Sequence, residues 1–177
     1  MQINSKFGVG LMITAVLLSI VGTIGFTVED SVESIPTPNV PNSVFFADDP
    51  VPSNPLALLV SANAELTWDR SDVFLVIGDS EKKEQCNGLT FIERTNQNTE
   101  ICTSRDNDFL AIGDDNLSGF TWSVKSGEYY VGIGSLNEVS GDFELNVDYE
   151  VKMTLSAPGY FAMVLMLFSG FVLNKYQ

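Results

Sequence analysis

The sequence predicts an all-β ectodomain, an antiparallel β-sandwich of seven or eight strands, flanked by N- and C-terminal transmembrane helices. Three observations lead to this fold class. Two uncharged apolar runs lie near the ends of the chain, and all 23 acidic residues lie between them. Within that middle part, apolar and polar residues alternate with a period of two, which is typical of strands with one buried and one solvated face. Gly, Asn and Asp residues separate these segments, as turns require.

The first apolar run, Phe7 to Phe26, contains 20 residues without a charge. A helix needs about 20 such residues to cross a bilayer core, so residues 1–26 are predicted to form a cytoplasmic stub and a transmembrane anchor. Lys6 and the amino terminus also fit the positive start of a secretory signal. The apolar run is longer than a usual signal core, and only residues 23–25 offer a cleavage site. We therefore favour an uncleaved anchor over a cleaved signal.

The second apolar run, Ala157 to Leu173, has 17 residues, which is at the short end of the spanning range. Residues 156–177 are predicted to form a C-terminal transmembrane helix with a short tail that reaches the headgroups. Lys6 and Lys175 lie at the outer ends of the two runs, and basic residues in that position favour the cytoplasm. The prediction is a cell-membrane protein with both termini cytoplasmic and residues 27–156 extracellular.

Small residues recur at helical spacing in both runs, and such stripes allow close helix packing in a membrane. The contact would be made either within the chain or with another membrane subunit, in addition to the lipid bilayer. The residues are Gly8, Ala15, Ser19 and Gly22 in the first run, and Gly159, Ala162, Ser169 and Gly170 in the second.

Residues 27–55 are predicted to form an acidic, semi-rigid stalk with polyproline II character, because they contain six of the seven prolines. Residues 44–46, Val-Phe-Phe, interrupt this polar composition. They are expected either to dock on the wall of the folded domain or to bind another protein. The six prolines are Pro36, Pro38, Pro41, Pro50, Pro52 and Pro55.

Residues 56–155 are predicted to form the sandwich, and their clearest strand runs from Phe143 to Leu155 with strict alternation. Phe120–Val124 and Tyr129–Ile133 are separated by Lys-Ser-Gly-Glu, which predicts a hairpin. The remaining predicted strands are Leu56–Ser61, Glu65–Trp68, Val73–Ile77, Leu89–Glu93 and Phe109–Ile112.

Cys86 and Cys102 are the two cysteines, and they are predicted to form one disulfide in an oxidising compartment. A metal site is the alternative, but the chain has no histidine and no Cys-x-x-Cys pattern to supply further ligands. The bridge would staple the loop around the predicted strand Leu89–Glu93.

Two groups of acidic residues bracket the predicted strand Phe109–Ile112, namely Asp106 with Asp108 and Asp114 with Asp115. Carboxylate oxygens are the ligands that Ca²⁺ prefers, so two calcium sites are one interpretation and solvated turn residues are the other. No cofactor is otherwise required. Asn116-Leu117-Ser118 matches the N-glycosylation acceptor pattern.

Composition excludes several classes of function. Without histidine the chain cannot form a Ser-His-Asp or Cys-His catalytic arrangement, and no catalytic residue is nominated, so a protein that is not an enzyme is predicted. Residues 27–156 contain 7 basic and 23 acidic residues, a net charge of −16. This charge argues against nucleic acid as a partner and against close contact with anionic lipid.

Two pairs of segments resemble the bacterial and archaeal pre-peptidase C-terminal domain. Residues 126–131 (Ser-Gly-Glu-Tyr-Tyr-Val) and 141–147 (Gly-Asp-Phe-Glu-Leu-Asn-Val) are similar to its two closing strands, and residues 66–69 and 72–75 to two earlier ones. The resemblance covers roughly residues 56–153. Phe74 stands where the family usually has an acid, and the cysteine-bounded insertion is not typical. The resemblance implies a small jelly-roll-like sandwich that serves as a non-catalytic accessory or binding module.

These observations together predict a membrane-anchored extracellular binding or adhesion module at a prokaryotic cell surface, with an archaeal origin favoured. Its sandwich face or loops would bind an extracellular glycan or protein. The alternative is an accessory or structural subunit of a larger membrane complex, with the two transmembrane helices as the contact surface.

Overall fold

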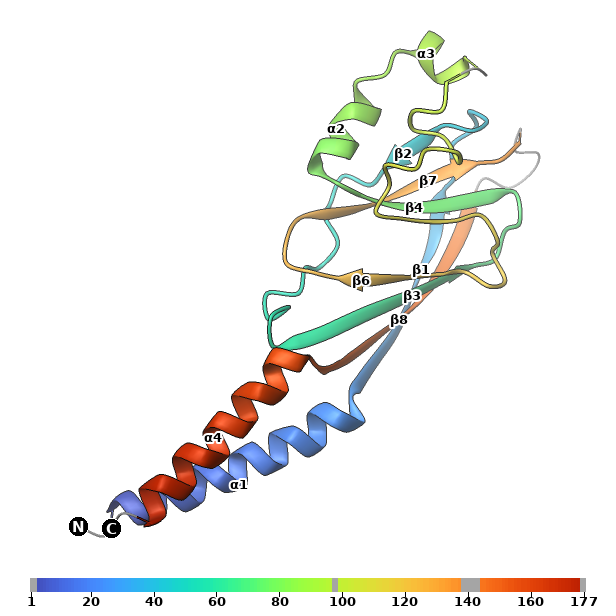
Figure 1. The fold of residues 1–177 in the computed structure, drawn as a ribbon. Coiled ribbons are helices and arrows are strands. Elements are labelled where there is room, and N and C mark those ends of the chain that lie inside the picture. The colour runs from blue at the N-terminus through green and yellow to red at the C-terminus, as the bar shows by residue number, and fades with distance from the viewer. Residues whose placement is uncertain (1–2, 97–98, 138–143, 176–177) are drawn as a thin grey trace.

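The computed structural model describes residues 3–96, 99–137 and 144–175. Two antiparallel sheets of four strands form a β-sandwich, and two long helices leave the same end of it side by side (Figure 1). The elements are α1 (Ile3–Ile24), β1 (Phe26–Pro36), β2 (Val44–Phe46), β3 (Val60–Trp68), β4 (Val73–Asp79), α2 (Ser80–Asn87), α3 (Phe91–Thr95), β5 (Ala111–Gly113), β6 (Phe120–Val124), β7 (Tyr129–Ser135), β8 (Glu144–Leu155) and α4 (Ala157–Lys175).

The first sheet has the strand order β1-β8-β3-β6, and the second has the order β2-β7-β4-β5. Alternate residues of β3, β6 and β8 point into the space between the sheets, where Trp68, Trp122 and Leu145 pack against Leu75 and Ile77 of β4. The predicted β-sandwich is confirmed, because the period-two alternation places one face of the first sheet in this core and the other in solvent.

The predicted hairpin of residues 120–133 is wrong. β6 pairs with β3 in the first sheet, whereas β7 pairs with β2 and β4 in the second. The turn at residues 125–128 therefore carries the chain from one sheet to the other, with Gly127 at φ +144°. Both strands direct apolar side chains to the same core, but they approach it from opposite sides, so their alternation alone could not distinguish a hairpin from a corner.

Residues 27–36 form a strand and not the stalk predicted from the prolines. β1 pairs antiparallel with β8, from Phe26 opposite Met153 to Pro36 opposite Glu144. Pro36 is the last residue of this edge strand, where its missing N–H removes no bond from the ladder. The Val-Phe-Phe segment docks on the domain as β2, and Val44 is fully buried.

Residues 89–93 do not form a strand, because the chain between β4 and β5 carries the two short helices α2 and α3. Residues 60–61 and 65–68 of two predicted strands lie in one strand, β3, whereas residues 56–59, also predicted to be extended, form a turn. Only Ala111 and Ile112 of the predicted strand 109–112 lie in β5. Phe143, the predicted first residue of the last strand, lies outside the described residues.

Residues Lys6–Ile24 and Ala157–Lys175 form helices that are long and apolar enough to cross a membrane. α1 and α4 pack against each other along their length (Figure 1). A Cβ atom on Gly8 would lie 2.8 Å from the Gly170 carbonyl oxygen, and Ala15 is fully buried. The predicted small-residue contact is thus made within the chain.

The other small residues differ in how far they take part in this contact. Gly22 and Gly159 both lie close to the Leu155 side chain, and the Ser19 hydroxyl donates to the Ala15 carbonyl at 2.8 Å. Ala162 is half-buried, whereas Ser169 is exposed. The backbones of α1 and α4 approach each other closely at Gly8 and Gly170, near the helix ends farthest from the sandwich, whereas Gly22 and Gly159 make room for residues of the sandwich.

Candidate functional site at the distal end of the sandwich

Residues 80–96 and 99–110, which we call the distal cap, comprise α2, α3 and the described part of the loop that returns to β5. The cap lies over the second sheet at the end of the molecule farthest from α1 and α4 (Figure 1). Cys86, Cys102 and Phe109 of the cap pack on Phe74 and Val76 of β4. Because the other face of β4 lies in the central core, this strand is buried on both sides.

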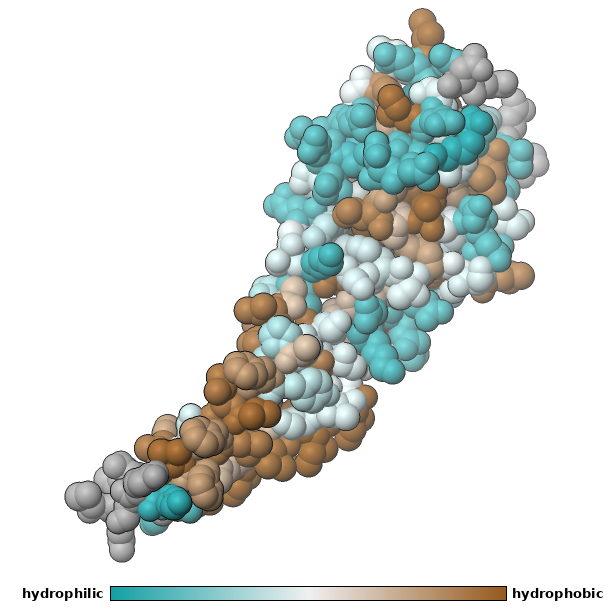
Figure 2. All heavy atoms as spheres, viewed as in Figure 1, coloured by the Kyte–Doolittle hydropathy of each residue, from teal (hydrophilic) through white to brown (hydrophobic). Residues whose placement is uncertain are grey.

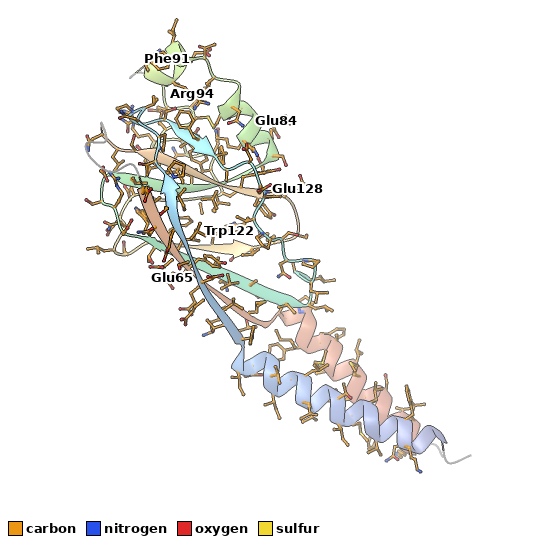
Figure 3. All side chains as sticks on the ribbon, turned by 180° about the vertical axis from the view of Figure 1, so that it is seen from behind. Glu65, Glu84, Phe91, Arg94, Trp122 and Glu128 are labelled. Carbon is orange, nitrogen blue, oxygen red and sulfur yellow. A yellow bond between two sulfur atoms is a disulfide. The ribbon has the colours of Figure 1, made fainter. Side chains whose placement is uncertain are left out.

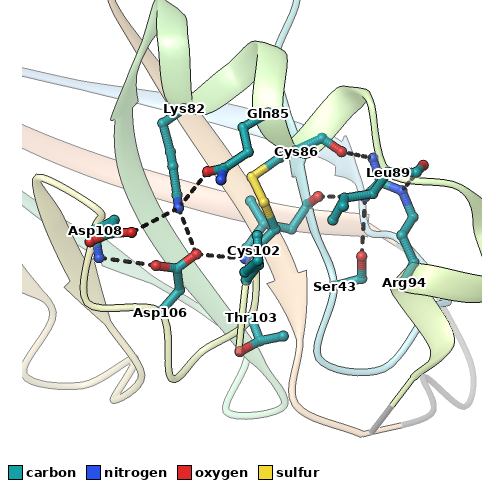
Figure 4. Close-up of a disulfide and its surroundings, with 12 residues drawn as sticks. Ser43, Lys82, Gln85, Cys86, Leu89, Arg94, Cys102, Thr103, Asp106 and Asp108 are labelled. Atoms are coloured by element: carbon teal, nitrogen blue, oxygen red, sulfur yellow. Dashed lines mark hydrogen bonds and ion pairs between the residues drawn. A yellow bond between two sulfur atoms is a disulfide. The ribbon is translucent and has the colours of Figure 1, made fainter. Parts of the chain in front are cut away.

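The predicted disulfide joins Cys86 of α2 to Cys102 in the returning loop (Figure 4). Both cysteines are buried. The Cys102 carbonyl accepts a hydrogen bond of 2.9 Å from the N–H of Val44 in β2. The bridge thus ties the two halves of the cap to each other and to the edge strand of the second sheet.

A buried ion pair lies beside the disulfide (Figure 4). Lys82 Nζ is 2.7 Å from Asp106 Oδ2 and donates to Gln85 Oε1 at 2.8 Å. Asp106 also accepts hydrogen bonds from the N–H groups of Cys102 at 2.6 Å and Asp108 at 3.0 Å. Burial would raise the pKa of Asp106, but these hydrogen bonds and the lysine charge outweigh it and hold the pKa below the ordinary value.

The candidate calcium ligands have other partners in this structure. Asp106 is occupied by Lys82, and the exposed Asp108 lies 3.8 Å from the same ammonium group. Asp115 accepts from the Leu117 N–H and the Ser118 hydroxyl, which lower its pKa, while Asp114 is exposed. Within residues 3–96, 99–137 and 144–175, no three Cys, Asp or Glu residues are grouped as a metal site. Calcium binding stays a prediction.

The glycosylation candidate Asn116 is half-buried, and its side-chain amide donates to the Trp68 carbonyl at 3.2 Å. This hydrogen bond holds the turn after β5 against the end of β3. Attachment of a glycan would require the amide to leave that carbonyl, and modification of Asn116 stays a prediction.

Arg94 of α3 points inward, toward the body of the cap (Figure 3). Its guanidinium donates to Ser43 Oγ at 3.1 Å, to the Val44 carbonyl at 2.9 Å and to the Cys86 carbonyl. It also lies over the Phe45 ring, 4.4 Å from the centroid. The Arg94 guanidinium therefore ties the inner side of α3 to the backbone of β2 and of α2.

Two large apolar side chains of α3 are exposed to solvent. Phe91 is 71% exposed and Ile92 is 80% exposed. Phe91 lies at the far tip of the molecule, opposite α1 and α4 (Figure 3), and the space-filling view shows apolar atoms at this tip (Figure 2). The helix start is fixed by a capping box in which Thr90 and Glu93 bond each other's backbone N–H. The polarity of α3 is thus the reverse of that of an ordinary surface helix.

A second surface of interest lies on the solvent face of the first sheet. Glu29, Glu150 and Glu65 are directly opposite one another on β1, β8 and β3. With Asp148 and neighbouring polar residues they line a shallow hollow of about 440 Å³. Like charges directly opposite on adjacent strands repel each other, so this face carries a concentrated negative potential.

Sequence reasoning identified neither surface. The exposed tip depends on α3, whose signal was the pattern Thr90-x-x-Glu93 of a capping box. The row of glutamates depends on strand register, and β1 was not expected to be a strand. A residue's cross-strand neighbours cannot be known until its partner strand is known.

Comparisons with known proteins place the chain in no family. No family model matches it, and no curated protein matches it. A solved structure of PliG from Aeromonas hydrophila, a periplasmic inhibitor of g-type lysozyme, is 6% identical, with a TM-score of 0.25 over 75% of this chain and 86% of that one. The capsid asymmetric unit of cyanophage Pam1 is 16% identical, with a TM-score of 0.26 over 76% and 87%. Neither likeness is close enough to support a conclusion.

Proposed function

We propose that this protein is a membrane-anchored, non-catalytic binding module that presents its distal cap to a protein partner outside a prokaryotic cell. Two helices that could cross a membrane extend from one end of the sandwich, and the disulfide fits an oxidising compartment. Lys6 and Lys175 at the far ends of the helices support cytoplasmic termini. We also propose that the sandwich is similar to pre-peptidase C-terminal domains, and this similarity agrees with a binding role.

The observation that carries this proposal is the reversed polarity of α3. The cap turns the half-buried, charged side chain of Arg94 inward and exposes Phe91 and Ile92. Full burial of such an apolar side chain contributes about 1.5–3 kcal/mol. Binding of a partner gains this free energy without the cost of ordering a loose loop, because the disulfide and Arg94 already fix the backbone. Rigid apolar anchors of this kind dominate the energy of many protein interfaces.

The charge of the ectodomain limits the chemistry of the partner. A net charge of −16 on residues 27–156 attracts cationic surfaces and repels nucleic acids and anionic lipids. An apolar tip on an acidic domain fits a protein pocket with apolar walls and a basic rim. A glycan, which offers mainly hydroxyl groups, fits Phe91 and Ile92 less well.

The test uses the full chain in lipid nanodiscs with three forms: wild type, the double variant F91S/I92S and the control L117S. Like Phe91 and Ile92, Leu117 is a largely exposed apolar residue, but it lies on the turn beside Asn116. Each form is incubated with surface proteins extracted from the source cells. A protein retained by wild type and L117S and lost with F91S/I92S supports the proposal.

The same experiment separates the alternative function. A stoichiometric membrane protein that all three forms retain would indicate an accessory subunit that associates through α1 and α4, and it would contradict a role for the tip. The observed packing is less favourable to that alternative, because Gly8, Ala15 and Gly170, for which a contact within the chain and a contact with another subunit were both considered, are occupied by the contact between the two helices.

A further inference from the structure

Three exposed apolar residues lie at the end of the sandwich that adjoins the helices. They are Leu58 at 73%, Phe26 at 63% and Leu56 at 57% exposure, and we call them the basal rim. Phe26 begins β1 and is separated from α1 by Gly25 alone, and the two leucines belong to the turn before β3. They are far from the distal cap, so the proposed partner of the cap does not cover them.

The turn that carries the two leucines is firmly held. The Asn54 side chain accepts from the Leu56 N–H at 3.1 Å and donates to the Val60 carbonyl at 2.7 Å. Backbone bonds from the N–H groups of Leu59 and Val60 to the Leu56 carbonyl, both 2.8 Å, close the turn. The leucines are thus displayed by a fixed backbone and not by a loose loop.

This turn is joined to the first residues of α4. Ser156 donates from its N–H to the Leu59 carbonyl at 2.9 Å and from its hydroxyl to the Leu58 carbonyl at 2.6 Å. A Cβ atom on Gly159 would lie 2.3 Å from the Leu59 carbonyl oxygen, so only glycine permits this approach. The backbone of the basal rim therefore sits within one helical turn of the start of α4.

The length of α4 fixes the level of this junction relative to a bilayer. Its 19 residues span about 28 Å at 1.5 Å per residue, close to the roughly 30 Å of hydrocarbon that a helix must cross. The helix has no excess length, so its first turn must lie at the hydrocarbon boundary. The Tyr160 hydroxyl bonds Thr23 Oγ1 of α1 at 2.9 Å, which sets the end of α1 at the same level, and tyrosine favours this boundary.

We infer that the basal rim is inserted into the outer leaflet of the same bilayer that the helices cross, so that the sandwich rests on the membrane. The inference depends on the proposed membrane anchoring. Its support is continuity: the apolar surface of the helix pair extends onto the near end of the sandwich (Figure 2). Lys152, next to Gly25, is placed to reach lipid phosphates, whereas the acidic residues of β1 begin at Glu29.

The test measures the depth of single tryptophans in the full chain, reconstituted in phosphatidylcholine vesicles with either ordinary or brominated acyl chains. Three variants are compared: L58W in the basal rim, L17W on the exposed side of α1, and L117W on the turn remote from the helices. The wild-type signal of Trp68 and Trp122, both buried in the core, is subtracted. All three positions are exposed leucines, so the substitutions are matched.

We expect brominated lipid to remove most of the added emission of L17W and L58W and to leave that of L117W unchanged. In the same vesicles, the emission maximum of the added tryptophan in L58W should also lie at a shorter wavelength than that in L117W. Quenching of L17W without quenching of L58W would overturn the inference and leave the anchoring intact. Absence of quenching in L17W would overturn both.

Discussion

The two sheets of the sandwich differ in what covers their outer faces. The first sheet, β1-β8-β3-β6, turns its outer face to solvent and lines it with polar and acidic residues. The second, β2-β7-β4-β5, has its outer face covered by the distal cap, through Phe74, Val76 and the disulfide. The second sheet is therefore buried on both faces. It forms a rigid base that holds Phe91 and Ile92 of α3 away from the core.

The largest expected difference concerns side chains on these two outer faces. F74A removes a fully buried ring beneath the cap and should lower the free energy of unfolding by about 3–5 kcal/mol. T121A, on the outer face of the first sheet, should change it by less than about 0.5 kcal/mol. Denaturant unfolding followed by Trp68 and Trp122 fluorescence measures both. Equal effects would mean that the cap does not cover the second sheet as described.

Loss of the disulfide should come next in size. Cys86 and Cys102 are 16 residues apart, and removal of a bridge across such a loop costs about 3 kcal/mol in the chain-entropy model. In the double variant C86S/C102S, amide hydrogen exchange should increase in residues 80–110 well before it increases in β3 and β8. Uniform acceleration in both sheets would show that the cap and the first sheet unfold as one unit.

Acid should loosen the cap through Asp106. Its pKa is lower in the folded protein than the ordinary value of about 3.9, so its contribution to stability is present above that value and is lost as the pH falls through the folded pKa. Each unit of difference corresponds to about 1.4 kcal/mol. Melting temperature measured from pH 7 to pH 3 should fall less steeply in D106N than in wild type. Parallel curves would assign the acid sensitivity to other carboxylates, such as Asp72 beside Arg70.

The smallest expected effect concerns the solvent face of the first sheet. E150K places a cation between Glu29 and Glu65 and should stabilise the protein by about 0.5 kcal/mol at low salt. The gain should disappear at 1 M salt, where the Debye length is about 3 Å. E128K, on the exposed turn after β6, is the control for the change in net charge. An equal gain in E128K would show that total charge, and not the register of the glutamates, is responsible.

The predicted strands of the two sheets differ in their sequence pattern for a physical reason. Strict alternation in residues 144–155 and 120–124 marks strands with one wet face, and both strands are confirmed. The apolar run at residues 73–77 lacks alternation because β4 is buried on both faces. The apolar run indicated that another segment packs on the outer face of the second sheet, but it did not indicate which segment.

The remaining errors arose where local composition and tertiary pairing disagree. Proline content suggested a stalk for residues 27–36, although Phe26, Val28 and Val32 alternate as in a strand and pair with β8. The tip of the cap was not predicted because exposed apolar residues in a sequence look like core residues. Exposure of Phe91 and Ile92 becomes evident only when α3 is placed with Arg94 inward.

The path of the chain at the base of the sandwich has a mechanical consequence. β1 continues from α1 across the single residue Gly25, β8 continues into α4 across Ser156, and these two strands are paired along their length. In the proposed membrane-anchored arrangement, a pull on the distal cap would reach the bilayer through two neighbouring strands at once. Two helices would share this tension, so each would carry only part of the force and the pair would resist extraction more firmly than a single helix.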